Sequence, residues 1–188
     1  MYKERNEEKR QEYLDKLLKI PEKNRVYVDE TGFQTFLTTL YGYAKRGCRL
    51  FAEKPGRKFQ RLNVLAAYVN NEIIAPLIYS ENTNTRVFND WIKFHLCPAL
   101  RPGQTVIMDN ASFHKSKETI ELIEAAKCNV LFLAPYSPDL NPIENFWGTL
   151  KGRVRIVSKY LSSLKDAISE CLIKTCDEIL EKVHSECA

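Results

Sequence analysis

Short apolar runs alternate with segments of helical spacing along this chain, which predicts a mixed α/β sheet with flanking helices. Six runs have the apolar and β-branched character of strands: 25–29, 34–41, 62–69, 72–79, 104–109 and 129–133. Asn70 and Asn71 favour a tight hairpin turn between two of them, because asparagine tolerates left-handed backbone. The last two strands flank a helical segment, which predicts a parallel pair joined by a crossover.

Five segments have apolar residues at helical spacing: 7–20, 84–96, 116–126, a helix beginning at Asn141 and Pro142, and 161–183. The spacing predicts that Pro21 ends the first and that Thr83 or Asn84 caps the second. The length of 188 residues suits one domain. We therefore expect a single domain over 1–188, with a helical lead-in at 1–24, a core at 25–157 and a C-terminal helix at 161–183.

The net charge of +4 conceals two concentrations of basic residues. Seven cations lie between 41 and 61 against one acid, Glu53, and a second cluster follows 145 with no acid before 160. The cations of the two stretches are Lys45, Arg46, Arg49, Lys54, Arg57, Lys58, Arg61, Lys151, Arg153, Arg155 and Lys159. Such density suits a polyanion such as DNA, whose phosphates release counterions on binding. A solvated loop and helix face is the alternative for these stretches taken alone.

Two aspartates directly follow short apolar strands. Asp29 follows VYV and Asp109 follows TVIM, so both carboxylates are expected at the ligand-binding ends of strands. Two such acids repel each other unless a cation lies between them, and Mg²⁺ prefers hard oxygen ligands. Each also has a plainer explanation, because Asp109 can start a turn with Asn110 and Asp29 can begin a loop at Thr31 and Gly32. The six cysteines show no spacing typical of a zinc site.

Glu144 fits two interpretations on local rules. Asn141 as N-cap and Pro142 at the first helical position would place Glu144 where a capping-box glutamate sits. A carboxylate in the first turn of a helix can equally project toward a metal. Lys151, two turns further on nearly the same side, is then a candidate for DNA contact.

Three segments, VYVDETGF, VIMDNASFHKS and LAPYSPDLNPIENFWGTLK, resemble the catalytic motifs of the mariner-like transposase superfamily, in particular its insertion-sequence branch. Between Asp109 and Glu144 lie 34 residues, which matches that family's spacing. The resemblance covers roughly 25–157. It implies a ribonuclease-H-like mixed five-stranded sheet with flanking helices, with Asp29, Asp109 and Glu144 as the metal-binding catalytic acids.

The resemblance further implies two-metal phosphoryl transfer, in which two Mg²⁺ ions, or Mn²⁺ in their place, activate water or a DNA 3′-hydroxyl. Its substrate would be double-stranded DNA, both element ends and target. The expected backbone contacts come from the basic stretch 45–61 and from Lys151, Arg153 and Arg155. His114 and Asn110 lie in the second motif, where His114 either orients DNA or a metal-bound water or serves a structural hydrogen bond. Strand alternation points Glu30 away from Asp29.

The chain has about 25 residues before its first motif, whereas relatives carry helix-turn-helix modules there. We expect weak, salt-sensitive DNA binding, a homodimer that holds two ends, and a possible separate helix-turn-helix partner. The charged N-terminus and the lack of a long apolar run predict a cytoplasmic protein, nucleoid-associated if bacterial, without a membrane segment. Two alternatives remain, a non-catalytic DNA-binding remnant of a mobile element and a ribonuclease-H-like repair or junction nuclease.

Overall fold

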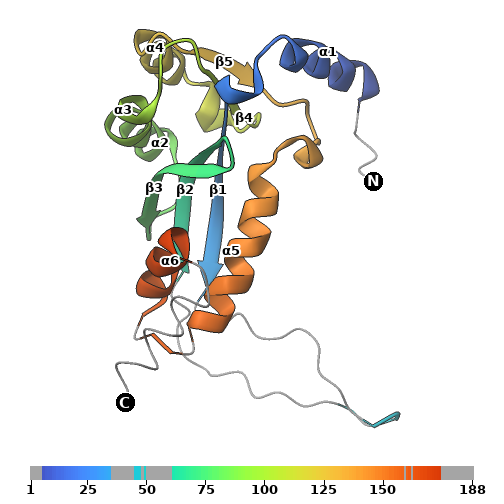
Figure 1. Cartoon of the computed structure of the whole chain (residues 1–188), viewed down its shortest axis with the longest axis vertical. Coiled ribbons are helices and arrows are strands. Elements are labelled where there is room, and N and C mark those ends of the chain that lie inside the picture. The colour runs from blue at the N-terminus through green and yellow to red at the C-terminus, as the bar shows by residue number, and fades with distance from the viewer. Residues whose placement is uncertain are drawn as a thin grey trace.

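The fold is a five-stranded sheet covered by helices on both faces (Figure 1). It was obtained as a computed structural model, which describes residues 6–34, 45–47, 49, 61–158, 160–161 and 163–174. The strands are β1 (Arg25–Gln34), β2 (Arg61–Val69), β3 (Glu72–Tyr79), β4 (Thr105–Met108) and β5 (Asn129–Phe132). The longer helices are α1 (Glu7–Leu18), α2 (Thr85–Trp91), α4 (Lys117–Ala125), α5 (Ile143–Val157) and α6 (Leu164–Ile173). Short helical turns complete the fold: η1 (Glu22–Asn24), η2 (Ile92–Leu96), α3 (Cys97–Ala99), η3 (Ser112–Lys115) and η4 (Pro138–Leu140).

The sheet has the order β3-β2-β1-β4-β5 and mixes two kinds of pairing. β1, β2 and β3 are antiparallel, whereas β4 and β5 run parallel to β1. The turn between β2 and β3 has positive φ at Asn70 (50°) and Asn71 (64°), as the sequence predicted. The expected mixed five-stranded sheet with flanking helices is therefore confirmed.

Alternating residues of β1 divide the interior into two cores. Tyr27 and Phe33 pack with α1, α5 and α6, whereas Val26 and Val28 pack with α2, η2 and α4. α5 contributes a stripe to the first core that is fully buried: Ile143, Trp147, Leu150, Val154 and Val157. Side chains of odd number on β1 thus face α5, and those of even number face α2.

β1 is longer than the sequence predicted. It continues without a break to Gln34, and both Thr31 and Gly32 pair with β2. The loop at Thr31 and Gly32, which was the alternative explanation of Asp29, is therefore wrong. The strand predicted at 34–41 lies, beyond Gln34, outside the described residues. The C-terminal helix is also shorter than expected, since α6 ends at Ile173 and Lys174 has extended backbone. The remainder of the predicted 161–183 helix lies outside the described residues.

The predicted lead-in helix is tied to the loop before α5. Tyr13 of α1 is buried in the first core. Arg10 donates from Nη1 to Asp139 Oδ1 at 3.0 Å and from Nη2 to Asp139 Oδ2, which makes a bidentate ion pair across 129 positions of sequence. This places α1 against η4, directly beside the start of α5. Within the described part of the chain, no helix has the length and apolarity needed to cross a membrane.

Candidate active site

One pocket of about 370 Å³ collects all three acids that the sequence singled out. Asp29, Asp109 and Glu144 line it together with the chain from Leu133 to Pro138 and Asn141. We call this the acidic pocket. The three acids come from β1, from the end of β4 and from the first turn of α5, so the fold brings together residues up to 115 positions apart.

Strand register explains why the two aspartates are neighbours. β1 and β4 run parallel with Tyr27 opposite Ile107, and β4 ends at Met108. Two residues beyond this pair on each strand, Asp29 lies level with Asp109. Asn110 fixes the exit from β4, because its side-chain nitrogen donates to the carbonyl oxygen of Leu133 at 2.5 Å.

Asp29 is half-buried and held from the α5 side. The indole Nε1 of Trp147 donates to its Oδ2 at 3.0 Å. Burial raises the pKa of Asp29 to about 7, and the negative charges of Glu144 and Glu30 add to the rise, against the opposing hydrogen bond from Trp147. A cation in the pocket would relieve this repulsion by favouring the ionised carboxylate.

Asp109 is held by a buried histidine. His114, whose exposed fraction is 1%, donates from Nδ1 to Asp109 Oδ1 at 2.5 Å, and its Nε2 lies 3.6 Å from Glu30 Oε2. Burial works to lower the pKa of His114, but the two carboxylates outweigh it and raise that pKa to about 9. Burial likewise works to raise the pKa of Asp109, yet His114 and the N–H of Ala111 hold it below its ordinary value.

This Glu30–His114–Asp109 chain corrects one sequence expectation. A side chain this buried has no surface for the direct DNA contact predicted for His114. It packs instead against the rings of Phe88 and Phe113, with its ring centroid 4.3 Å from each of theirs. Glu30 projects from β1 to the face opposite Asp29, as strand alternation predicted.

The start of α5 does not use the capping arrangement that local rules favour. No side chain caps the helix, Glu144 is exposed, and its N–H bonds to the carbonyl oxygen of Asn141 at 3.2 Å. The side-chain oxygen of Asn141 is buried without a hydrogen-bond partner. An orphaned buried oxygen on the wall of a carboxylate-lined pocket points to a ligand there, since buried polar atoms are normally paired.

The carboxylates share the pocket without forming a closed cluster. Among the described residues, no three His, Cys, Asp or Glu side chains are set closely enough to hold a metal ion as they stand. The donor set nevertheless fits a hard divalent cation, because three carboxylates and the Asn141 oxygen are the ligands that Mg²⁺ prefers.

The residues predicted to contact DNA fall into three groups. Arg61, at the start of β2, and Lys151 of α5 line one hollow of about 380 Å³ with Gly32 and Gln34. Arg153 is half-buried and Arg155 exposed, both on α5. Of the basic stretch, Lys45, Arg46 and Arg49 are exposed, whereas Lys54, Arg57 and Lys58 lie outside the described residues, as does Lys159.

Comparison with known families shows to which family the chain belongs. Residues 24–167 match the DDE superfamily endonuclease family, which is most of the chain. The chain belongs to this DDE family. The match begins one residue before β1 and extends into α6, and so includes all three acids.

The similar proteins include transposases. Over 125 residues the chain is 51% identical to the Tc3 transposase of Caenorhabditis elegans, covering 59% of this chain and 37% of that protein. The Mos1 strand transfer complex has a TM-score of 0.69 at 18% identity, covering 96% of this chain and 59% of that one. Mos1 paired-end complexes with Mg and with Mn give TM-scores of 0.63 and 0.62 at 16% and 18% identity. Each covers 98% of this chain, and 64% and 63% of the Mos1 chains respectively.

These structural matches establish the ribonuclease-H-like fold of the Mos1 catalytic domain for this DDE chain. The chain spans about a third of the Tc3 transposase and less than two thirds of the Mos1 chain in the strand transfer complex.

Proposed function

We propose that this chain is the catalytic domain of a DNA transposase that cleaves DNA strands and joins them to a target during movement of an insertion sequence. The observation that carries the proposal is the convergence of Asp29, Asp109 and Glu144 on one pocket. Membership of an endonuclease family and the similarity to the Tc3 transposase support it.

Asp29, Asp109 and Glu144 would hold divalent ions, Mg²⁺ with Mn²⁺ as a substitute. When bound, such ions supply activation of an attacking hydroxyl and stabilisation of the leaving 3′ oxygen. The protein's own part is positional: Trp147 orients Asp29, and His114 orients Asp109. Arg61 and Lys151 supply positive charge for a phosphate in the hollow that they share.

The wider assembly follows from the same proposal. Paired-end complexes are described for Mos1, and holding two DNA ends requires at least two catalytic domains. We propose a homodimer acting on double-stranded DNA, with a helix-turn-helix module on a separate partner. We further propose a cytoplasmic location, at the nucleoid if the host is bacterial.

A nicking and joining assay tests this function. The whole chain would be incubated with supercoiled plasmid and an oligonucleotide bearing a free 3′-hydroxyl, in Mg²⁺, Mn²⁺ or EDTA. We expect nicked plasmid and joined product with either metal and neither product in EDTA. Metal-dependent nicking without joining would favour the repair or junction nuclease. DNA binding without nicking would favour the non-catalytic remnant.

Replacing His114 by glutamine should weaken metal binding while all three acids of the acidic pocket stay in place. Glutamine keeps a donor but loses the charge and the fixed ring that hold Asp109. Loss of a group that orients a metal ligand typically weakens metal affinity roughly 10–100-fold. Mn²⁺ affinity measured by electron paramagnetic resonance checks this, with circular dichroism as the control for folding. An unchanged affinity in the folded variant would contradict the positioning role.

Gly148 and Gly152 of α5 offer a test of the DNA-facing side. A Cβ added at either position meets no atom within 4 Å, and neither has positive φ. Alanine should therefore stabilise the fold by roughly 0.5–1 kcal/mol at each site. Gly148 lies one turn from Glu144 and nearly one turn from Lys151, so Gly148→Ala should also weaken DNA binding. Urea unfolding measures the stability, and fluorescence anisotropy of labelled DNA measures the binding. A folded Gly148→Ala variant that binds DNA no more weakly than the wild type would contradict a close DNA approach there.

A further inference from the structure

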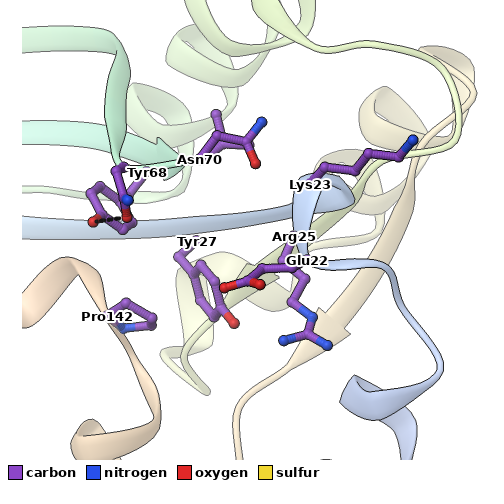
Figure 2. Close-up of a pocket in the computed structure, with 9 residues that line it drawn as sticks. Glu22, Lys23, Arg25, Tyr27, Tyr68, Asn70 and Pro142 are labelled. Atoms are coloured by element: carbon purple, nitrogen blue, oxygen red, sulfur yellow. Dashed lines mark hydrogen bonds between the residues drawn. The ribbon is translucent and has the colours of Figure 1, made fainter.

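A second pocket, of about 580 Å³, lies on the α5 side of the sheet (Figure 2). Pro142 lines this pocket and its neighbour Asn141 lines the acidic pocket. Its walls come from η1 and the start of β1, from the β2–β3 hairpin and from the residue before α5. We call it the hairpin pocket. Its volume is in the range of small-ligand sites, about 300–1,000 Å³.

Two residues of its wall connect the hairpin pocket to the acids. Tyr27 precedes Asp29 by two positions on the same face of β1, and Pro142 precedes Glu144 by two positions. Two residues of strand span about 6.6 Å, which is close to two base-pair rises of DNA. A DNA strand that runs from the acids along β1 toward its first residue would therefore reach the hairpin pocket within one or two nucleotides.

The walls of the hairpin pocket suit a flat aromatic ligand. Figure 2 shows Tyr27, Tyr68 and Pro142 bordering the same space. Two contacts hold the ring of Tyr68, because its hydroxyl donates to Asn71 Oδ1 at 3.0 Å and its ring centroid lies 6.3 Å from that of Phe146. Nucleobases stack on rings held in this way.

The polar groups of the pocket suit the remainder of a nucleotide. Lys23 and Arg25 supply two cations against the single carboxylate of Glu22, which favours a phosphate over a metal ion. The Nε of Arg25 donates to the carbonyl oxygen of Ile20 at 2.9 Å, which fixes this side chain. The side-chain amides of Asn70 and Asn71 offer donors and acceptors for the edge of a base.

We propose that the hairpin pocket binds one unpaired nucleotide of the DNA strand that enters the acidic pocket. Its base stacks against Tyr68 and Pro142, and a phosphate of the same strand reaches Lys23, which Figure 2 shows at the opposite end of the pocket. This inference rests on the proposed function, because it assigns the pocket to the same DNA strand.

Fluorescence of 2-aminopurine tests the proposal without any cleavage. A single strand of about twelve nucleotides that carries this base would be titrated with the whole chain in EDTA. We expect quenching by the wild type and by Tyr68→Phe, which keeps the ring but not the hydroxyl. Tyr68→Leu should relieve the quenching and raise Kd roughly tenfold. Equal quenching and affinity for Tyr68→Leu and Tyr68→Phe would overturn the proposal.

A charge comparison adds a second criterion. The logarithm of the DNA-binding constant falls as the logarithm of the salt concentration rises. Lys23→Ala should make this slope shallower by about 1, because one phosphate contact is lost. Lys165→Ala makes the same charge change on α6, which lies at the other end of β1 in Figure 1, and should leave the slope unchanged. Equal slopes for the two variants would count against the site. Nicking in Mn²⁺ is read separately, so loss of cleavage with intact quenching overturns the proposed function and not this pocket.

Discussion

Asp109→Asn is expected to abolish metal-dependent nicking, with a rate at least about a thousandfold below that of the wild type. The substitution keeps the shape of the side chain and removes one of the three negative charges on the acidic pocket. Metal ions contribute several kcal/mol to the stabilisation of charge in such reactions, and each 1.4 kcal/mol is about tenfold in rate. Initial rates of plasmid nicking in Mg²⁺ and Mn²⁺ measure the loss.

A matched variant separates this loss from a general effect of charge. Asp90 is an exposed acid of α2 that pairs with Arg86 at 3.9 Å, on the opposite side of the sheet. Asp90→Asn makes the same chemical change there and should nick DNA at the wild-type rate. Equal rates for the Asp109 and Asp90 variants, both folded, would remove Asp109 from the catalytic acids.

Trp147→Ala is expected to lower the free energy of unfolding by roughly 3–5 kcal/mol. The indole has an exposed fraction of 1% and packs in the core between α5 and the sheet. Its removal leaves a large cavity and also deprives Asp29 of its hydrogen-bond donor. Urea unfolding followed by circular dichroism measures the change.

Trp147→Phe distinguishes packing from the hydrogen bond. Phenylalanine retains most of the buried surface, so the loss of stability should be clearly smaller than with alanine. It lacks the N–H donor that opposes the rise in the pKa of Asp29, so that pKa should rise further. A stability loss as large as that of Trp147→Ala would contradict the packing argument.

The features predictable from sequence are those set by local rules. The paired asparagines at 70 and 71 fixed the hairpin, because few other residues adopt positive φ at both turn positions. Apolar runs before Asp29 and Asp109 located both acids at strands, and the motif resemblance supplied the fold. The helical stripe of α5 was visible because burial repeats along one face.

The features missed are those that depend on tertiary contacts. Local rules favoured Asn141 as a helix cap, but its side-chain oxygen is orphaned on the wall of the acidic pocket. The Trp147–Asp29 hydrogen bond joins residues 118 positions apart, and the only signal for it was that a buried indole N–H needs an acceptor. Strand alternation placed Glu30 behind Asp29, yet only the packing of η3 brings His114 beside it. The continuation of β1 past Gly32 depends likewise on its pairing with β2.

Anomalous diffraction from crystals of the whole chain soaked in Mn²⁺ is the most direct test of the metal site. We expect anomalous density in the acidic pocket, within ligand distance of carboxylate oxygens from Asp29, Asp109 and Glu144, and its loss in Asp109→Asn. Nicking that requires Mn²⁺, together with density confined to other parts of the molecule, would contradict a metal site formed by these three acids.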